Sequence, residues 1–187
     1  MFFKKKNKEI VELCVTLYKL IVEQSRIKEF YLNLKIPDTI DGRFELIILH
    51  FFLLERTLDK EIKKDQLIYK ELLEIMYKDF DMSLREIGVG DLSVGKKIYQ
   101  MTEAFSGRLF AYRKFNNKKN FGSMGITIKR NIYGTVNNVD AKNIEIIKSY
   151  IIDSMEVIDK STIYKISENS SIFIDLNRYI IKYNKGF

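Results

Sequence analysis

Residues 38–58 read DTIDGRFELIILHFFLLERTL, and this stretch decides the fold. From Phe44 to Leu58 the sequence is apolar nearly all round, whereas a helix on the surface of a protein is apolar on one face only. Its most apolar part, Leu46–Leu54, is too short to cross a bilayer, because a spanning helix takes about 20 residues. We therefore predict that this segment forms the central, buried helix of a helical domain.

The residues just before this helix predict where it begins. Pro37 disfavours a helical conformation at the residue before it, so Asp38 is predicted as the helix cap. Asp41 follows in the first turn, where a carboxylate faces the positive end of the helix. Gly42 costs about 1 kcal/mol in a helix relative to Ala. Its presence predicts that another backbone segment approaches the first turn closely.

Further helices are predicted on both sides, because apolar residues recur at three-to-four spacing and the chain has one Pro and nine Gly. The predicted helices are residues 8–24, residues 66–87, a helix from Asp91 or Ser93 through Tyr112, a helix from Asp140 to about Ile158, and a last amphipathic helix with Ile172, Leu176, Tyr179, Ile180 and Tyr183. Gly88 is predicted as a left-handed cap. Periodicity does not decide whether residues 126–134 are helical or extended. We predict an all-α, single-domain, orthogonal or irregular bundle of about six to seven helices.

Positive charge is concentrated in one part of the chain. The formal net charge of the whole chain is +7. Between Ser93 and Arg130 the only acid is Glu103, and the basic residues are Lys96, Lys97, Arg108, Arg113, Lys114, Lys118, Lys119, Lys129 and Arg130. Such a stretch attracts RNA, anionic lipid or an acidic protein patch, and the alternative is a solvated helix face. A second cluster suits a membrane surface or is a frayed end: Lys4, Lys5, Lys6 and Lys8 beside Phe2 and Phe3.

The residues that carry most metal and redox chemistry are scarce. One cysteine, Cys14, allows no internal disulfide, and with His50 as the only histidine no zinc site of the Cys/His kind can be built. We expect a reducing compartment, a buried thiol at Cys14 and a hydrogen-bonded core histidine. The apolar run near the start contains Glu12 and Lys19, so we expect no signal peptide.

Two motifs near the middle of the chain resemble ligand sites only in part. Asp79, Asp81, Glu86 and Asp91 gather near one bend and invite a magnesium site, hence a magnesium-dependent helical enzyme as one class of function. Pairing of Asp81 with Arg85 and capping by Asp91 account for these acids without a metal. The run from Gly90 to Lys97 lacks the preceding strand and the hydroxyl residue of a phosphate-binding loop. We predict no enzyme, no metal and no cofactor.

Three segments of the chain resemble one known family. The segment FYLNLKIPDTIDGRFELIILHFFLL (30–54) resembles the first signature of the ubiquinol–cytochrome c chaperone family, and MYKDFDMSLREIGVGDLSVGKKIYQMTEAFSGRLFAY (76–112) resembles the second. KRNIYG (129–134) is similar to a third, weaker block. The resemblance covers roughly residues 25–135, in order.

The resemblance implies a helical chaperone that helps to build respiratory complex III. Members of the family bind newly made cytochrome b, in mitochondria close to the ribosome exit, and hold it for haem loading. The implied partners are apocytochrome b or another complex III subunit, a ribosome, an anionic membrane surface and a small adaptor protein, and no DNA. The expected location of this bacterial-type member is the cytoplasm, with peripheral binding at the inner face of the cytoplasmic membrane.

The domain division follows from the resemblance. Residues 1–24 are expected to form a basic segment and an amphipathic helix packed on the core, and residues 25–135 form the chaperone core. Residues 136–160 hold the last helix of the domain. The tail, residues 161–187, lies outside the resemblance, and its helix is expected to dock on the core, a membrane or a partner.

Within this family assignment, the two junctions PDTIDGR (37–43) and REIGVGD (85–91) are expected to lie together at helix ends as one recognition surface. The predicted partner-binding residues are Asp38, Asp41, Arg43, Arg85, Asp91, Lys96, Lys97 and Arg108. The alternative for Arg43 and Arg85 is structural pairing with nearby acids. The alternative function is a ribosome- or RNA-binding module that uses residues 93–130. Placement of Arg43 and Lys96 on opposite sides, each sealed in its own network, would contradict the single surface.

Overall fold

The protein is a bundle of helices in a computed structural model that describes residues 8–116, 120–168 and 173–184. In chain order the elements are α1 (Lys8–Ser25), α2 (Lys28–Leu32), α3 (Ile40–Glu55), α4 (Lys63–Glu86), α5 (Asp91–Arg113), the 3-10 turn η1 (Lys114–Asn116), α6 (Phe121–Ile132), α7 (Ala141–Ile158), α8 (Ile163–Glu168) and α9 (Asn177–Asn184). Across these ranges no strand occurs, and seven helices have eight residues or more. The predicted all-α bundle is confirmed.

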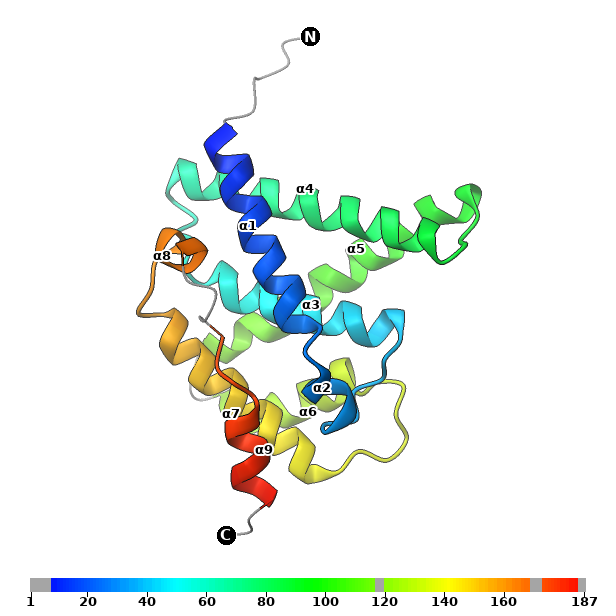
Figure 1. The fold of residues 1–187 in the computed structure, drawn as a ribbon, viewed down its shortest axis with the longest axis vertical. Coiled ribbons are helices and arrows are strands. Elements are labelled where there is room, and N and C mark those ends of the chain that lie inside the picture. The colour runs from blue at the N-terminus through cyan, green and yellow to red at the C-terminus, as the bar shows by residue number, and fades with distance from the viewer. Residues whose placement is uncertain (1–7, 117–119, 169–172, 185–187) are drawn as a thin grey trace.

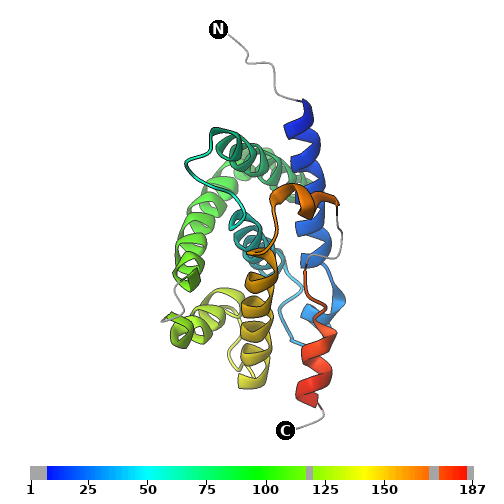
Figure 2. The ribbon, with the colours of Figure 1, turned by 90° about the vertical axis from the view of Figure 1, so that its left-hand side faces the viewer.

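The predicted central helix is α3. It contacts α1, α5, α6 and α7, and every residue from Phe44 to Leu54 is buried. Figure 1 shows α3 behind α1, and the turned view in Figure 2 shows α5 and α6 on one side of α3 and α7, with α1, α2 and α9 on the other. A helix covered on both sides must be apolar all round, which explains its sequence.

The start of α3 differs by one residue from the prediction. Thr39, not Asp38, is the cap, since its hydroxyl Oγ1 accepts a hydrogen bond from the Gly42 N–H at 3.2 Å. The Asp38 carboxylate accepts a hydrogen bond from Arg43 Nε instead, at 2.7 Å. The close approach at Gly42 is confirmed, because a Cβ there would lie 2.0 Å from the carbonyl oxygen of Pro37.

The bend between α4 and α5 is built on glycine. Gly88 has a φ of +86°, which confirms the predicted left-handed cap. The N–H of Val89 returns to the carbonyl of Leu84 at 3.0 Å, as in a Schellman motif. Gly90 is the cap residue of α5, so the predicted capping by Asp91 is wrong. Asp91 is the first residue of α5, and its carboxylate binds Arg85 rather than a backbone N–H.

His50 confirms its predicted place in a hydrogen-bonded core. Its Nδ1 lies 2.7 Å from the carbonyl oxygen of Leu46, which can only accept, so Nδ1 carries the proton. Its Nε2 therefore accepts a hydrogen bond from the Tyr150 hydroxyl, at 2.8 Å. Burial lowers the pKa of His50 to about 4, so the ring is neutral at pH 7. Cys14 is also buried, as predicted.

Most of the segment that periodicity left undecided, residues 126–134, is helical. Residues 126–132 belong to α6, and the last amphipathic helix is α9, which packs on α7 with Leu176, Tyr179 and Ile180 buried. The tail helix thus docks on the core. Ile172 and the cluster Phe2, Phe3, Lys4, Lys5 and Lys6 lie outside the described residues. In the ranges that the structure covers, no helix is both long enough and apolar enough to cross a membrane.

Candidate functional site

The first junction, 37–43, and the end of α4 line a hollow, which of the second junction, 85–91, includes Glu86 and Ile87. At its floor are four side chains that line both of its halves: Ile40, Phe44, Leu84 and Met101. Ile40 and Phe44 come from the start of α3, Leu84 from the end of α4 and Met101 from α5. We call this hollow the junction groove. The first junction, 37–43, and the end of α4 therefore meet across an apolar floor.

The first half of the junction groove is a cavity of about 200 Å³. Its remaining wall residues are Ser25, Arg26, Tyr31, Arg43, Ile47, Asp79, Phe80, Ser83, Glu86 and Ile87. Its charged side chains are Arg26, which directly follows α1, Arg43 at the start of α3, and the acids Asp79 and Glu86 of α4. The cavity can therefore hold an apolar side chain of a partner and bind charged groups of either sign beside it.

The second half of the junction groove is more polar. Its remaining wall residues are Thr39, Asp41, Lys97, Gln100, Ala104 and Arg108. Lys97, Met101, Ala104 and Arg108 follow one another at spacings of three and four residues, so they lie on one face of α5. Asp41 stands on the α3 side of this half.

Arg43 is paired but remains accessible. Its Nε donates to Asp38 at 2.7 Å, and the side chains of both residues are more than half exposed. The hydrogen bond from Arg43 lowers the pKa of Asp38 below its ordinary value. The structural pairing that the sequence left open is therefore present, and Arg43 also lines the groove.

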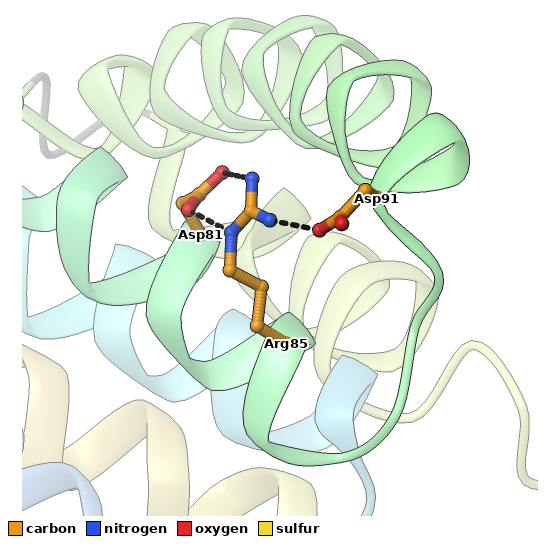
Figure 3. A network of polar contacts seen from close by, with 3 residues as sticks. All are labelled: Asp81, Arg85 and Asp91. Carbon is orange, nitrogen blue, oxygen red and sulfur yellow. Dashed lines mark hydrogen bonds and ion pairs between the residues drawn. The ribbon is translucent and has the colours of Figure 1, made fainter.

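Arg85 holds the bend together. Figure 3 shows its guanidinium between two carboxylates, with Asp81 on the same helix and Asp91 at the start of α5. The Nε group donates to Asp81 Oδ2 at 2.6 Å. Neither Arg85 nor Asp91 lines the junction groove. These two predicted partner-binding residues thus serve the geometry of the bend.

Arg108 is anchored to the core from the groove. Its Nε donates to Glu45 Oε1 at 2.7 Å, and Glu45 is buried. Burial raises the pKa of Glu45 to about 7, and the positive charge of Arg108 opposes that rise. Arg113 makes a similar pair with Glu55 on α3, at 2.6 Å. Two ion pairs therefore tie α5 to α3.

These ion pairs change the interpretation of the basic stretch. Arg108 and Arg113 are neutralised by acids outside residues 93–130, while Lys118 and Lys119 lie outside the described residues. Among the described residues, less net positive charge remains for RNA than the sequence indicates. The RNA-binding alternative stays a prediction.

Lys96 and Lys97 have different surroundings. Both are exposed, but Lys97 lines the groove and Lys96 is absent from its lining. Neighbouring helix positions differ by about 100° around the axis, so two consecutive lysines cannot share a face. Of the predicted site residues, the structure brings Asp41, Arg43, Lys97 and Arg108 to the groove, and Asp38 to its rim through Arg43.

The apolar floor is the part of the site that sequence reasoning missed. Periodicity places Met101 in the packing stripe of α5, and Ile40 stands out only as a neighbour of the capping residues. The spacing of Met101 and Ala104 between Lys97 and Arg108 is the signal that could have identified this face of α5. Arg26 and Asp79 also lie in the wall.

Asp79, Asp81 and Asp91 near the bend have protein partners. Asp79 accepts a hydrogen bond from Tyr18 at 2.7 Å, and Asp81 binds Arg85. Within the described ranges no three His, Cys, Asp or Glu side chains gather as metal ligands would. The interpretation by pairing thus fits Asp79 and Asp81.

Comparisons with known proteins agree on one family. The family model described as "Ubiquinol-cytochrome C chaperone" matches residues 32–173. The mouse ubiquinol-cytochrome c reductase complex assembly factor 1 is 21% identical over 76% of this chain and 48% of its own length. The human protein of that name is 24% identical over 51% of this chain and 32% of its own length. The chain thus spans half or less of these curated relatives.

A solved structure extends the similarity to the fold. The crystal structure of the Cbp3 homolog from Brucella abortus superposes with a TM-score of 0.78 at 25% sequence identity. The superposition covers 94% of this chain and 96% of that one. The matched family region contains both junctions and the whole junction groove except Ser25, Arg26 and Tyr31. The chain belongs to the ubiquinol–cytochrome c chaperone family.

Proposed function

We propose that this protein is an assembly chaperone of respiratory complex III that binds newly made cytochrome b in the junction groove and catalyses no reaction. The observation that carries the proposal is the apolar floor with charged walls, built where the two family segments meet. The mouse and human relatives are named as assembly factors of the ubiquinol–cytochrome c reductase complex, which supports a role in assembling that complex.

The chemistry of the groove suits such a client. An unassembled membrane protein exposes apolar side chains, and an apolar pocket shields them from water. Ile40 is 45% exposed at the edge of the floor, where a client side chain can cover it. Arg43, Asp79 and Glu86 in the first half of the groove and Arg108 in the second half can select charges that flank the apolar segment.

The remaining parts of the proposal concern place and partners. A chaperone for a membrane subunit acts where that subunit is inserted, so we place it peripherally at the inner face of the cytoplasmic membrane. A ribosome and a small adaptor are further proposed partners. Haem loading of the client takes place on the client, and no residue of this chain is assigned to haem.

Ile40→Asp tests the groove. Position 40 is the first residue of α3, where an acid is favoured by the helix dipole, so the variant should fold. Its charge would lie in the apolar floor. We expect capture of tagged cytochrome b from detergent-solubilised membranes to fall at least about tenfold, which corresponds to about 1.4 kcal/mol.

A matched control is available at the other end of α4. Ile62 is the cap residue of α4 and is 50% exposed, remote from the groove lining. Ile62→Asp introduces the same charge at a helix start and should leave capture unchanged. Equal capture by both variants would remove the groove from the proposal. If the wild type captures no cytochrome b and still binds purified ribosomes or RNA in a salt-sensitive way without it, the RNA-binding alternative is favoured.

A further inference from the structure

The outer face of α5 exposes large apolar side chains, and the one described cation stacked on them, Lys114 with its Nζ 4.8 Å from the Phe110 ring centroid, leaves that ring mostly exposed. Leu92 is 101% exposed, Tyr99 64% and Phe110 66%. The opposite face of the helix is buried, as expected for a helix at the edge of a bundle. Single exposed apolar residues are common, but three on one face of one helix indicate an interface.

These side chains follow a regular spacing. Steps of four, three, four, three and four residues lead along one line of exposed positions: Leu92, Lys96, Tyr99, Glu103, Ser106 and Phe110. Alternation of three and four is the repeat by which one helix packs along another over several turns. We call this line the outer seam. It is distinct from the groove face of α5, which carries Lys97, Met101 and Arg108.

The outer seam is complementary to itself. If two copies pair antiparallel about the point midway between Tyr99 and Glu103, Leu92 of one copy meets Phe110 of the other at both ends. Lys96 then lies within one helical turn of the other copy's Glu103, on both sides of the two-fold axis. An interface with two-fold symmetry requires this self-complementarity. We propose that the outer seam is the interface of a homodimer in which two α5 helices pack antiparallel.

The charges on and beside the seam favour a second copy. Lys96 forms no ion pair with any described residue, and Glu103 accepts only a hydrogen bond from Tyr99, at 3.1 Å. The positions that flank the seam are uncharged: Ser93, Gly95, Gln100, Thr102 and Gly107. Pairing therefore forms two ion pairs and brings no like charges together along the flanks.

Two glycines inside α5 support a close approach. Gly95 and Gly107 each cost about 1 kcal/mol relative to Ala in a helix interior. Neither has a neighbour within 4 Å of the place where a Cβ would be, so packing within the chain does not require them. In the antiparallel pairing Gly95 of one copy stands at the level of Gly107 of the other. Their missing side chains let the two backbones approach at two symmetric levels.

Charge reversal on the full-length chain tests the dimer. Lys96 and Glu103 are exposed, so Lys96→Glu and Glu103→Lys should fold. In a dimer of either single variant, the two contacts between positions 96 and 103 both join like charges. We therefore expect sedimentation velocity to give a dimer Kd about tenfold higher than that of the wild type. The double variant Lys96→Glu/Glu103→Lys should dimerise like the wild type.

Mixing the two single variants makes the test specific. The mixed dimer has opposite charges at both sites, so we expect an equimolar mixture to dimerise about tenfold more tightly than either variant alone. Ile126→Ser, at an exposed residue of α6, should leave the Kd unchanged. A wild type that stays monomeric at its highest soluble concentration overturns the proposal, as does a dimer that both reversals leave intact or a mixture that stays monomeric. The assay needs no client, so its failure leaves the proposed chaperone function unaffected.

Discussion

Gly42→Ala should destabilise the protein, although the same change stabilises most helices. In an unobstructed helix, Ala gains about 1 kcal/mol over Gly. At position 42 the new Cβ would lie 2.0 Å from the carbonyl oxygen of Pro37 and 3.1 Å from its carbonyl carbon. Since ordinary contacts begin near 3.4 Å, the backbone at Pro37 must move by roughly 1.4 Å, which is overpacking against a main chain rather than a flexible side chain.

The size of the loss follows from the contacts that this movement breaks. Overpacking of this kind costs about 1–3 kcal/mol. The Thr39 cap on the Gly42 N–H is disturbed as well, and such a cap contributes about 1 kcal/mol. Together these exceed the propensity gain, so we expect a net loss of about 1–3 kcal/mol. Because Ile40 and Phe44 flank this turn, the shape of the junction groove should change with it.

Urea unfolding of dilute protein measures this effect, with the midpoint expected to fall and the slope to stay constant. Gly107→Ala is the matched control, since nothing lies within 4 Å of its Cβ position. It should raise the stability of the dilute protein by up to about 1 kcal/mol. A Gly42→Ala variant as stable as the wild type, or changes of equal sign at both positions, would refute the steric reasoning.

Three further predictions concern hydrogen-bonded polar groups. Tyr150→Phe removes the hydroxyl that donates to His50 Nε2, and thermal or urea unfolding should show a loss of about 1–3 kcal/mol, whereas an unchanged midpoint would contradict the network. Glu45 favours the folded state when protonated, because burial raises its folded pKa from 4.5 to about 7. Its contribution to stability is present below the unfolded pKa and is lost as the pH rises through about 7. The free energy of unfolding, relative to that of Glu45→Gln, should therefore fall between pH 4.5 and about 7, and parallel pH profiles of the two proteins would disprove the shift. Arg56→Gln breaks a two-pronged pair with the exposed Asp159 that joins α3 to the end of α7, and should lower stability by up to about 1 kcal/mol. The loss should be smaller in the Asp159→Asn background, where the bond of Arg56 to Asn116 remains to be lost, and equal losses in both backgrounds would contradict the pair.

The sequence allowed much of the fold to be predicted because its local signals agree with the tertiary structure. The apolar segment 44–54 has no polar face, so only a fully covered position suits it. Gly42 and Gly88 are explained by a close backbone approach and a positive φ, both of which their sequence positions predict. The caps are harder to predict, because Asp38, Thr39 and Asp91 can all cap a helix. Arg43 binds the carboxylate of Asp38 and Arg85 binds that of Asp91, so neither carboxylate caps its helix.

Residues 126–132 show where periodicity fails. Ile126 and Ile128 alternate as in a strand, whereas Met124, Ile128 and Ile132 recur as in a helix. In α6 the second set is buried and Ile126 is 72% exposed, so packing rather than pattern selects the helix.

The candidate site was predictable only in part. Charged residues at the two junctions stand out, but the sequence does not reveal which of them face each other. Lys96 and Lys97 are adjacent in sequence yet only Lys97 lines the groove. Arg108 is predicted at a partner surface, and its bond to the buried Glu45 depends on a residue 63 positions away. The apolar floor unites three helices, so it exists only in the folded chain.

Site-specific photo-crosslinking at these two lysines tests the central claim most directly. A photoreactive phenylalanine analogue is placed at position 97 or at position 96 in cells, and adducts with newly made cytochrome b are identified by mass spectrometry. Binding in the junction groove predicts cytochrome b adducts from position 97 and none, or far fewer, from position 96. Adducts from position 96 alone, or none from position 97 while the chaperone still supports complex III assembly, would contradict it.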